Sequence, residues 1–491
     1  MIDRVKMPIS MGASNHSLGN TAFCDYKRNI DEISLTIQVG AGSNSRSVRI
    51  DDDTRLEFTH WGCGTSLGIP THLSAKFLII PENMLNEAKA LEKHKIRGLW
   101  NLITCDPDAI VVTPYHRVWS QLTEMTSKLT KGTCGSGAGR AYAQDNFIPD
   151  MTIHAIDLVD GRYIEEKLRN LRAYVIDETR CITKDSFKRE EDVSRFLELQ
   201  LVLNDIDDTR LKYIASEFRV LGKYLHLLTT EDALATHDGT AIVEHSHGVL
   251  SDSEVGFKPY VSSMRTLPQL TDEYLRKCGY KGRIWHYAVH SAYEYRHGPG
   301  PMPTERGEKY RKKLGIAQDE NRWRGPIRVG DFDMVQLLYA IDCCGGPEYF
   351  DGFWLTCFDR IMANPSTAKE LIPKIIDDVV DKPRGKKPCV HVATSFKTKT
   401  RLSWNICTGY YPDKDICKMY RLDTPLTTEL LNNVTPYISN IIFPADPREF
   451  QDKEVIFNFV KQTIEEYTGI PLDAVSYGTS EDRKIWRETL H

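Results

Sequence analysis

The chain has 491 residues, of which 41% are hydrophobic and 27% are charged, a composition typical of an ordinary globular protein. Its formal net charge is −5 with both signs spread along the chain, so no basic field predicts binding to nucleic acid or to a membrane surface. The twelve cysteines include no Cys-x-x-Cys pair, which argues against a zinc site or a disulfide framework. With no apolar leader and no run of eighteen apolar residues, we expect a cytoplasmic protein with reduced thiols.

The first third of the chain alternates between strand and helix patterns. Residues 33–50 predict a strand, a glycine turn and a second strand, and residues 81–93 have apolar side chains at helical spacing. A short strand is predicted at 109–112. Thr113 and Pro114 then predict a helix start, because threonine caps helices and proline suits the first turn.

The middle of the chain, residues 163–228, predicts charged helices in which Phe196, Leu197 and Val202 face inward. After it the alternation returns, with strands predicted at 241–243, 284–295, 353–356 and 474–477 and helices at 331–341 and 453–467. This order favours a largely parallel sheet covered by helices. We expect a single domain over residues 1–491, with a helical subregion at about 160–230 and a C-terminal β/α portion at about 385–491.

Residues 291–306, SAYEYRHGPGPMPTER, are the stretch from which we interpret the rest. An aromatic strand pattern stops at Arg296, and alternating glycine and proline at 298–301 then predict a rigid extended loop. Such a loop either holds a ligand or is only a tight exit from a strand. Composition alone favours the second interpretation.

The stretch resembles the adenylosuccinate synthetase family, whose strand ending Ala-Tyr-Thr-Thr-Arg-Val-Gly leads through a glycine and proline loop to Pro-Phe-Pro-Thr-Glu. Further motifs follow in the family's order. KGTCGSGAGRAY at 131–142 is similar to Gly-Thr-Thr-Gly-Arg-Gly-Ile-Gly-Pro-Ala-Tyr, residues 243–263 to a segment beginning Phe-Glu-Gly-Ala-Gln-Gly, and LTCFD at 355–359 to Leu-Thr-Lys-Leu-Asp. The chain is identified as a divergent member of this family.

The resemblance implies one large α/β domain with a long, mainly parallel sheet, related to the P-loop GTPase scaffold but without a Walker motif. It also implies a homodimer. The family condenses aspartate with inosine monophosphate, using GTP and Mg²⁺. The expected partners are therefore a purine nucleotide, either GTP or a nucleoside monophosphate, and an amino acid, whereas no magnesium ligands can be identified in the sequence.

The catalytic loops depart from the family pattern. His16 to Ala22 occupy the loop that supplies the family's base aspartate and phosphate-binding lysines, and Ser45 occupies the position of its catalytic histidine. Ser136 stands in place of an arginine, and His247 in place of the glutamine that reads the purine six-oxygen. Because loss of a general acid or base costs ~10²–10⁴ in rate, we do not expect the standard activity.

The matching positions give a set of candidate site residues. His16 and His247 are candidate catalytic replacements. Those expected at a purine nucleotide are Thr133, Gly135, Gly137, His247 and Arg296; those at GTP are Asp359, Gly478 and Thr479; and those at an amino acid or carboxylate are Thr304, Arg324 and Arg328. We rank Asp359 first, because a buried carboxylate is costly without a donor partner.

Each candidate also has a structural interpretation. His16 lies in a polar turn, where a histidine more often caps or faces solvent, and residues 132–139 could be only a flexible connection. His245 and His247 with Glu244 could form a metal pair, although a remodelled turn is favoured. Arg324 and Arg328 could form surface ion pairs, and residues 382–387 (KPRGKK) are interpreted as a solvated loop.

Three functions remain open: a purine-nucleotide-binding, remodelled ligase; a catalytically inactive relative with a structural, assembly or regulatory role; and a genuine GTP-dependent adenylosuccinate synthase with displaced catalytic residues. The first predicts a cleft between Thr133, His247 and Arg296 that accepts a phosphate-bearing or carboxylate ligand. The second predicts a collapsed cleft, filled by side chains of Tyr293, Tyr295 or Met302.

Overall fold

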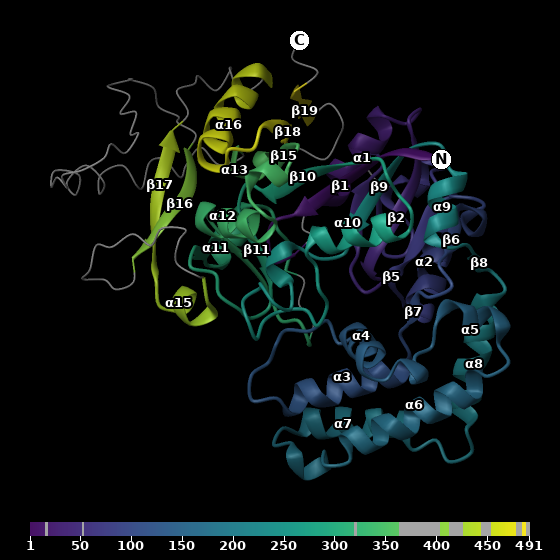
Figure 1. Cartoon of the computed structure of the whole chain (residues 1–491). Helices are drawn as coiled ribbons and strands as arrows, with labels where there is room; N and C mark the ends of the chain where they lie inside the picture. The colour runs from purple at the N-terminus through teal and green to yellow at the C-terminus, as the bar shows by residue number, and fades with distance from the viewer. Residues whose placement is uncertain are drawn as a thin grey trace.

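The computed structural model describes residues 1–14, 18–51, 54–318, 322–362, 403–411, 426–442, 453–477 and 484–487. Figure 1 shows a body built on a large sheet, with a lobe of blue helices, α3 to α8, beneath it. Within the described ranges no helix is long and apolar enough to cross a membrane.

An eleven-stranded sheet runs through the body in the order β19-β18-β15-β10-β1-β9-β2-β5-β6-β8, with β7 paired to β5. Its strands are β1 (Ile2–Ser10), β2 (Ile33–Ala41), β5 (Thr71–Ile79), β6 (Ile103–Cys105), β7 (Ile110–Val111), β8 (His226–Leu227), β9 (Gly239–His245), β10 (Arg283–Ser291), β15 (Gly352–Thr356), β18 (Leu472–Ser476) and β19 (Lys484–Trp486). Every pair in it is parallel except β18 with β19. The predicted large, mainly parallel sheet is confirmed.

Three small sheets flank the large one. They pair β3 (Arg46–Arg49) with β4 (Arg55–Phe58), β11 (Glu294–His297) and β12 (Glu305–Arg306) with β13 (Ile327–Gly330), and β14 (Phe332–Asp333) and β17 (Thr435–Ile442) with β16 (Ser403–Tyr411). Figure 1 shows β16 and β17 as a long hairpin beside the body.

The helices fall into two groups. Those around the sheet are α1 (Leu18–Arg28), α2 (Pro81–Lys93), α9 (Thr230–Thr236), α10 (Pro268–Lys277), α11 (Glu308–Lys313), α12 (Met334–Cys343), α13 (Phe358–Met362), α15 (Thr428–Asn432) and α16 (Lys453–Thr468). Those of the lobe are α3 (Pro114–Thr126), α4 (Ala138–Phe147), α5 (Ala155–Asp160), α6 (Ile164–Thr179), α7 (Glu190–Leu203) and α8 (Thr209–Gly222).

The central strands are apolar on both faces because each face carries a core. On β9, Ala241 and Val243 belong to one hydrophobic cluster, whereas Ile242 between them belongs to another that continues into the helical lobe. Side chains alternate across a strand, so a strand covered on both sides has an apolar run rather than an alternating pattern.

Local signals predicted several elements well. The helix at 81–93 is confirmed as α2, and Thr113 caps α3, its Oγ1 accepting a hydrogen bond from the His116 amide at 3.3 Å. The helix expected from residue 331 begins only at Met334, because Asp333 is its cap. The strand expected over 284–295 is broken after Ser291, where the chain leaves the large sheet to form β11.

Two other predictions were wrong. Leu197 was expected to face inward, yet it is 53% exposed, because the buried face of α7 is made by Phe196, Leu199 and Leu203. The strand expected at 474–477 is not the last one, since β19 follows β18 at the edge of the sheet.

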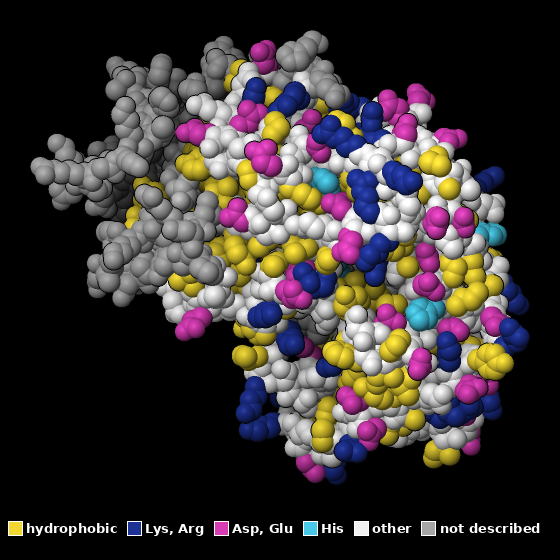
Figure 2. Space-filling view, viewed as in Figure 1, with side chains coloured by type: hydrophobic (Ala, Val, Ile, Leu, Met, Phe, Trp, Pro, Cys, Tyr) yellow, Lys and Arg dark blue, Asp and Glu magenta, His cyan; other side chains and the backbone are white. Residues whose placement is uncertain are grey.

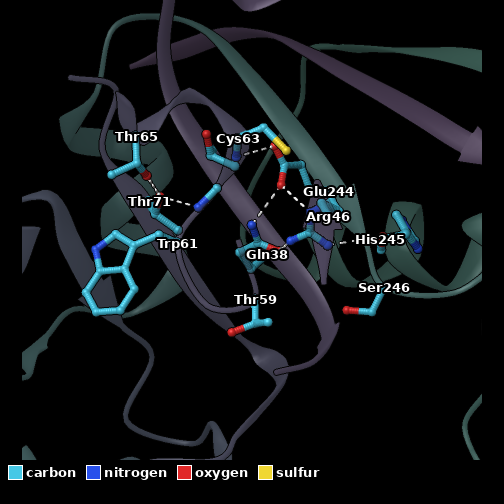
Figure 3. Close-up of polar contacts among 12 residues, drawn as sticks. Gln38, Arg46, Thr59, Trp61, Cys63, Thr65, Thr71, Glu244, His245 and Ser246 are labelled. Carbon is cyan, nitrogen blue, oxygen red and sulfur yellow. Dashed lines mark hydrogen bonds and ion pairs between the residues drawn. The ribbon is translucent and has the colours of Figure 1, made fainter. Parts of the chain in front are cut away.

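A buried ion pair joins the β3–β4 hairpin to the large sheet (Figure 3). Arg46 Nε lies 2.8 Å from Glu244 Oε2, and both side chains are 0% exposed. Gln38, the register partner of Glu244 on β2, donates to the same oxygen at 2.9 Å. Although burial opposes it, the Glu244 carboxylate raises the pKa of Arg46. The guanidinium therefore stays charged inside the protein.

The second Glu244 oxygen is equally engaged. Oε1 accepts hydrogen bonds from Tyr26 Oη at 2.9 Å and from the Cys63 amide at 3.0 Å. One carboxylate therefore ties together β9, β2, α1, the turn at Cys63 and the start of β3. A buried charge is tolerated only with such complete pairing.

We predict that Glu244→Gln destabilises the protein by about 3–5 kcal/mol, because Arg46 would keep its charge and lose its counterion. Glu57→Gln is the matched control: it removes an exposed partner of Arg55 on the same hairpin and should cost less than about 1 kcal/mol. Urea unfolding followed by circular dichroism measures both. Equal losses of unfolding free energy in the two variants would contradict the prediction that the buried ion pair contributes more than the exposed one.

A second buried cluster lies where β10 meets β14. The Asp333 carboxylate is 0% exposed and accepts hydrogen bonds from Tyr410 Oη at 2.6 Å and from the Gln336 amide at 3.1 Å. Burial, and then the nearby Glu294 charge, raise the pKa of Asp333 to about 7. His290 lies 3.3 Å from Glu294, which raises the pKa of His290 although burial acts against it.

We predict that Asp333 makes stability fall as pH rises from about 4 to about 7, because between its unfolded and folded pKa values the folded state binds the extra proton. Asp333→Asn lacks this titration. Thermal unfolding at about pH 5 and about pH 8 should therefore show a smaller loss on going to high pH in the variant than in the parent chain. Asp31→Asn, at an exposed turn, should behave like the parent, and identical pH profiles for all three would refute the prediction.

Candidate functional site

A cavity of about 1080 Å³ opens at the C-terminal edge of the parallel strands. Residues at or just beyond the ends of β1, β2, β9, β10, β15 and β18 line it, among them Ala13, Asn44, His247, Tyr293, Asp359 and Ser476. Figure 2 shows the surface hollowed between body and lobe, with positive and negative side chains interspersed over this face. Ligands of open α/β sheets bind at this edge.

The opposite wall comes from the helical lobe. Ser120, Thr123 and Glu124 of α3 line the cavity together with residues 131–134 and the start of α4. Glu124 Oε1 accepts hydrogen bonds from the amides of Lys131 at 2.7 Å and Gly132 at 3.2 Å, which ties this loop to α3. The cavity therefore lies between sheet and lobe.

Glycines let three loops meet at the rim. Gly298 has a φ of +68°, and a Cβ there would lie 1.9 Å from the carbonyl oxygen of Arg324. A Cβ on Gly132 would lie 2.6 Å from Pro299 Cδ. The guanidinium of Arg328 donates to the carbonyl oxygens of Gly298 at 3.1 Å and Gly300 at 2.8 Å. The predicted rigid loop is present, and only glycine permits its contacts.

Arg296 lines the cavity, but its guanidinium is bound to the backbone of the loops around it. It is 7% exposed, and its guanidinium donates to the carbonyl oxygens of Pro299 at 2.8 Å and Tyr260 at 3.0 Å. Burial, followed by the neighbouring Arg328 charge, lowers the pKa of Arg296 to about 10. Its main structural effect is to hold the 298–301 loop in place.

The glycine loop ends at the N-terminus of α4. Gly137 is the N-cap with a φ of +89°, and a Cβ there would lie 2.5 Å from the His116 backbone. Thr133 Oγ1 accepts from the Gly135 amide at 3.1 Å, and Ser136 Oγ from the Ala138 amide at 3.3 Å. Thr133 and Ser136 line the cavity, so the positive end of the helix dipole faces it.

Positive charge dominates the lining. Eight cationic side chains and three carboxylates line the cavity: Arg46, Arg49, Arg55, Lys131, Arg140, Arg296, Arg324 and Arg360 against Glu57, Glu124 and Asp359. Glu244 neutralises the buried Arg46, and Glu57 pairs with Arg55, yet the cations that remain still outnumber the carboxylates. In a chain whose net charge is −5, this local excess favours an anionic ligand.

The structure brings together several of the candidates. Thr133, His247, Arg296, Arg324 and Asp359 all line the cavity. The predicted cleft between Thr133, His247 and Arg296 is confirmed. The alternative of a collapsed cleft is wrong, because Tyr293 and Tyr295 line the cavity without filling it and Met302 is buried elsewhere.

Other candidates are not brought together. Gly135 and Gly137 shape the loop without lining the cavity, and Thr304 is buried away from it. Arg328 pairs with Glu305 and with loop carbonyls, as in its structural interpretation. His16, Gly478, Thr479 and residues 382–387 lie outside the described residues.

Asp359 occupies the cavity wall but is not the buried carboxylate that we expected. Its side chain is 35% exposed and lies 3.7 Å from Arg360 Nε. β15 ends at Thr356, and Cys357, at a φ of +57°, turns the chain so that Asp359 falls in the first turn of α13. The carboxylate is partly exposed and lines the cavity.

Sequence reasoning missed several lining residues. Arg140 stands within the quoted KGTCGSGAGRAY motif, and Asn44 and Arg46 flank Ser45, yet only glycines and family positions were considered. Counting the cations in each matched loop would have found Arg140 and Arg46. Arg360 and Tyr260 carry no comparable signal, because only the fold places them at the cavity.

The described residues offer no metal site. No group of three or more histidine, cysteine, aspartate or glutamate side chains is arranged within them to hold an ion. Glu244 is bound to Arg46, so it does not join His245 and His247 as a ligand. With two of the three lining carboxylates engaged, these residues do not match the oxygen set that Mg²⁺ requires.

Comparison with known proteins gives one consistent result. The family model for adenylosuccinate synthetase matches residues 30–364. The adenylosuccinate synthetase of Aquifex aeolicus is 26% identical over 418 residues, covering 83% of this chain and 81% of the relative, and that of Pediococcus pentosaceus is 24% identical over 428 residues with the same shares. The fully ligated adenylosuccinate synthetase from Plasmodium falciparum has the same fold, with a TM-score of 0.70 at 14% identity over 99% of this chain and 100% of that one. The chain belongs to the adenylosuccinate synthetase family.

Proposed function

We propose that the cavity binds a phosphate-bearing purine nucleotide and that the chain is a remodelled ligase of its family, with an altered substrate or altered chemistry. The observation that carries this proposal is the excess of cations over carboxylates in a cavity at the C-terminal edge of the sheet. Phosphate groups are the anions best matched to such a lining, because arginine and helix N-termini both bind them.

The proposed binding mode divides the cavity in two. A phosphate would lie near Thr133, Ser136 and Arg140, where the α4 N-terminus supplies amide donors. At the other end the partly exposed carboxylate of Asp359 would accept hydrogen bonds from the N–H edge of a guanine. Arg324 would bind a carboxylate of an amino acid. Gly478 and Thr479 remain predictions for the base slot.

The described residues support binding more clearly than chemistry. Ser45, exposed in the cavity, has no acidic proton to offer near neutral pH, and burial lowers the pKa of His247 to about 4, so its ring is neutral. We propose that any Mg²⁺ arrives with the nucleotide phosphates. His16 remains a predicted replacement base, and the homodimer and the cytoplasmic location also remain predictions.

A catalytically inactive relative is the second candidate. The chemistry of Ser45 and His247 favours it. Ser45 and His247 both line the cavity, but a serine hydroxyl is not acidic and burial keeps the His247 ring neutral, so neither provides the imidazolium or strong acid that phosphoryl transfer would use. Binding without turnover would be its signature.

We predict that GTP raises the thermal unfolding temperature and that Asp359→Ala weakens GTP binding. A ligand at one hundred times its Kd stabilises the folded state by about 2.7 kcal/mol, and each hydrogen bond to a charged group contributes about 1.5–3 kcal/mol. A screen of purine nucleotides with and without Mg²⁺, followed by calorimetry, measures both. Asp31→Ala, at an exposed turn outside the cavity, is the control. Unchanged GTP affinity in Asp359→Ala would remove that residue from the site, and no binding by any nucleotide would defeat the proposal.

We also predict no measurable adenylosuccinate formation from inosine monophosphate, aspartate and GTP. The replacements at residues 16–22 and at Ser45 each remove a group worth ~10²–10⁴ in rate. Because such groups act as one unit, removing them abolishes most of the rate enhancement. The assay follows product absorbance beside an ordinary family member as positive control. Turnover approaching that of the control would instead support a genuine synthase with displaced catalytic residues.

A further inference from the structure

Two side chains that follow neighbouring strands meet at the cavity wall. Asn44 lies in the turn after β2, and His247 lies just after β9. Asn44 Nδ2 is 3.0 Å from the carbonyl oxygen of Ser246 and 3.1 Å from His247 Nε2. Both residues line the cavity.

These two contacts determine where the histidine proton lies. The Ser246 carbonyl can only accept, so the Asn44 atom facing it must be the amide nitrogen, whose two N–H groups donate to Ser246 and to His247. His247 Nε2 must therefore accept and carries no proton. Since burial lowers the pKa of His247 to about 4, the neutral ring holds its single proton on Nδ1.

Within the described part of the chain, no hydrogen bond from the protonated nitrogen to a protein acceptor is recorded. Among the described residues Asn44 is the hydrogen-bond partner recorded for His247, and Nδ1 is not one of the buried atoms that lack a partner. Because the ring lines the cavity, this N–H is open to a ligand. A neutral imidazole in this tautomer offers a ligand one donor and no acceptor there.

We propose that Asn44 is a positioning residue that locks the tautomer of His247, and that His247 Nδ1–H is a specificity-determining donor to an acceptor oxygen of the bound nucleotide. The proposal rests on the proposed nucleotide site and adds its selectivity: an oxo or phosphate oxygen is accepted at this point, and an amino group is rejected. The rejection arises because two facing donors leave both unpaired in a buried place.

The first test reads the tautomer in the ligand-free protein, independently of any binding. Two-bond proton–nitrogen spectra of histidine-labelled protein, with the His247 signals assigned from the His247→Gln variant, should show a protonated Nδ1 and a bare Nε2 at neutral pH. Asn44→Asp should move the proton to Nε2 or make the ring cationic, because a carboxylate only accepts. A protonated Nε2 in the parent chain, or an unchanged tautomer in Asn44→Asp, would overturn the proposal.

The second test reads selectivity by calorimetry. Inosine monophosphate, inosine and adenosine monophosphate serve as probes, since they differ in the phosphate and in the six-substituent. His247→Phe should weaken the binding of inosine monophosphate roughly three- to tenfold, the loss expected for one neutral hydrogen bond. His247→Gln keeps an N–H donor and should recover part of the lost affinity. If the acceptor is the oxo group, His247→Phe should weaken the binding of inosine equally and leave that of adenosine monophosphate unchanged. If the acceptor is a phosphate oxygen, the variant should weaken the binding of adenosine monophosphate and leave that of inosine unchanged.

A matched variant separates the effect of the His247 tautomer on binding from the effect of added negative charge. Asn20 also lines the cavity, and its Oδ1 accepts from the Arg49 amide at 2.9 Å, so Asn20→Asp adds the same negative charge without touching His247. Asn44→Asp should weaken inosine monophosphate more than Asn20→Asp does. Equal losses in the two variants, or equal losses of all three probes in His247→Phe, would overturn the assignment. A confirmed tautomer with no nucleotide bound would instead refute the proposed function, and with it the role of His247 as a selector.

Discussion

The ion pair between Arg46 and Glu244 is the interaction on which the rest of the site depends. Both side chains are fully buried, so the charge of each is tolerable only because the other is present. The pair holds the β3–β4 hairpin against β2 and β9, and the turn that leads into this hairpin carries Asn44 and Ser45 to the cavity. A change in Glu244 would therefore reach the ligand site through the backbone, although Glu244 itself does not line the cavity.

The shape of the cavity and its chemistry have separate origins. Its shape comes from close backbone approach at Gly132, Gly298 and Gly325 and from arginines used as braces, since Arg296 and Arg328 donate to loop carbonyls. Its chemistry comes from side chains beyond the strand ends, which can change without disturbing that frame. The side chains that line the cavity of about 1080 Å³ can therefore differ while its shape is kept.

The remaining polar groups favour recognition over acid–base chemistry. His247 is neutral and is a hydrogen-bond donor, whereas Asp359 is a partly exposed carboxylate, which only accepts. Positive charge surrounds them, although both signs are mixed over the face seen in Figure 2. A nucleotide would gain from the charge wherever it binds, and its orientation would depend on the few directional groups.

The sequence by itself determined the elements that local chemistry specifies: helix α2 from its apolar spacing, the start of α3 from Thr113 and Pro114, the 298–301 loop from its glycines and prolines, and the family from motifs in order. The family resemblance also pointed to Thr133, His247 and Arg296 as neighbours, and all three line the cavity. Only the tertiary structure decided what each group does. Arg296 holds the loop carbonyls, Asp359 is partly exposed rather than buried, and Arg46 is the partner of Glu244, a residue almost two hundred positions away. Burial and hydrogen-bond partners set charge, tautomer and availability, and both arise from contacts between segments that are distant in the chain.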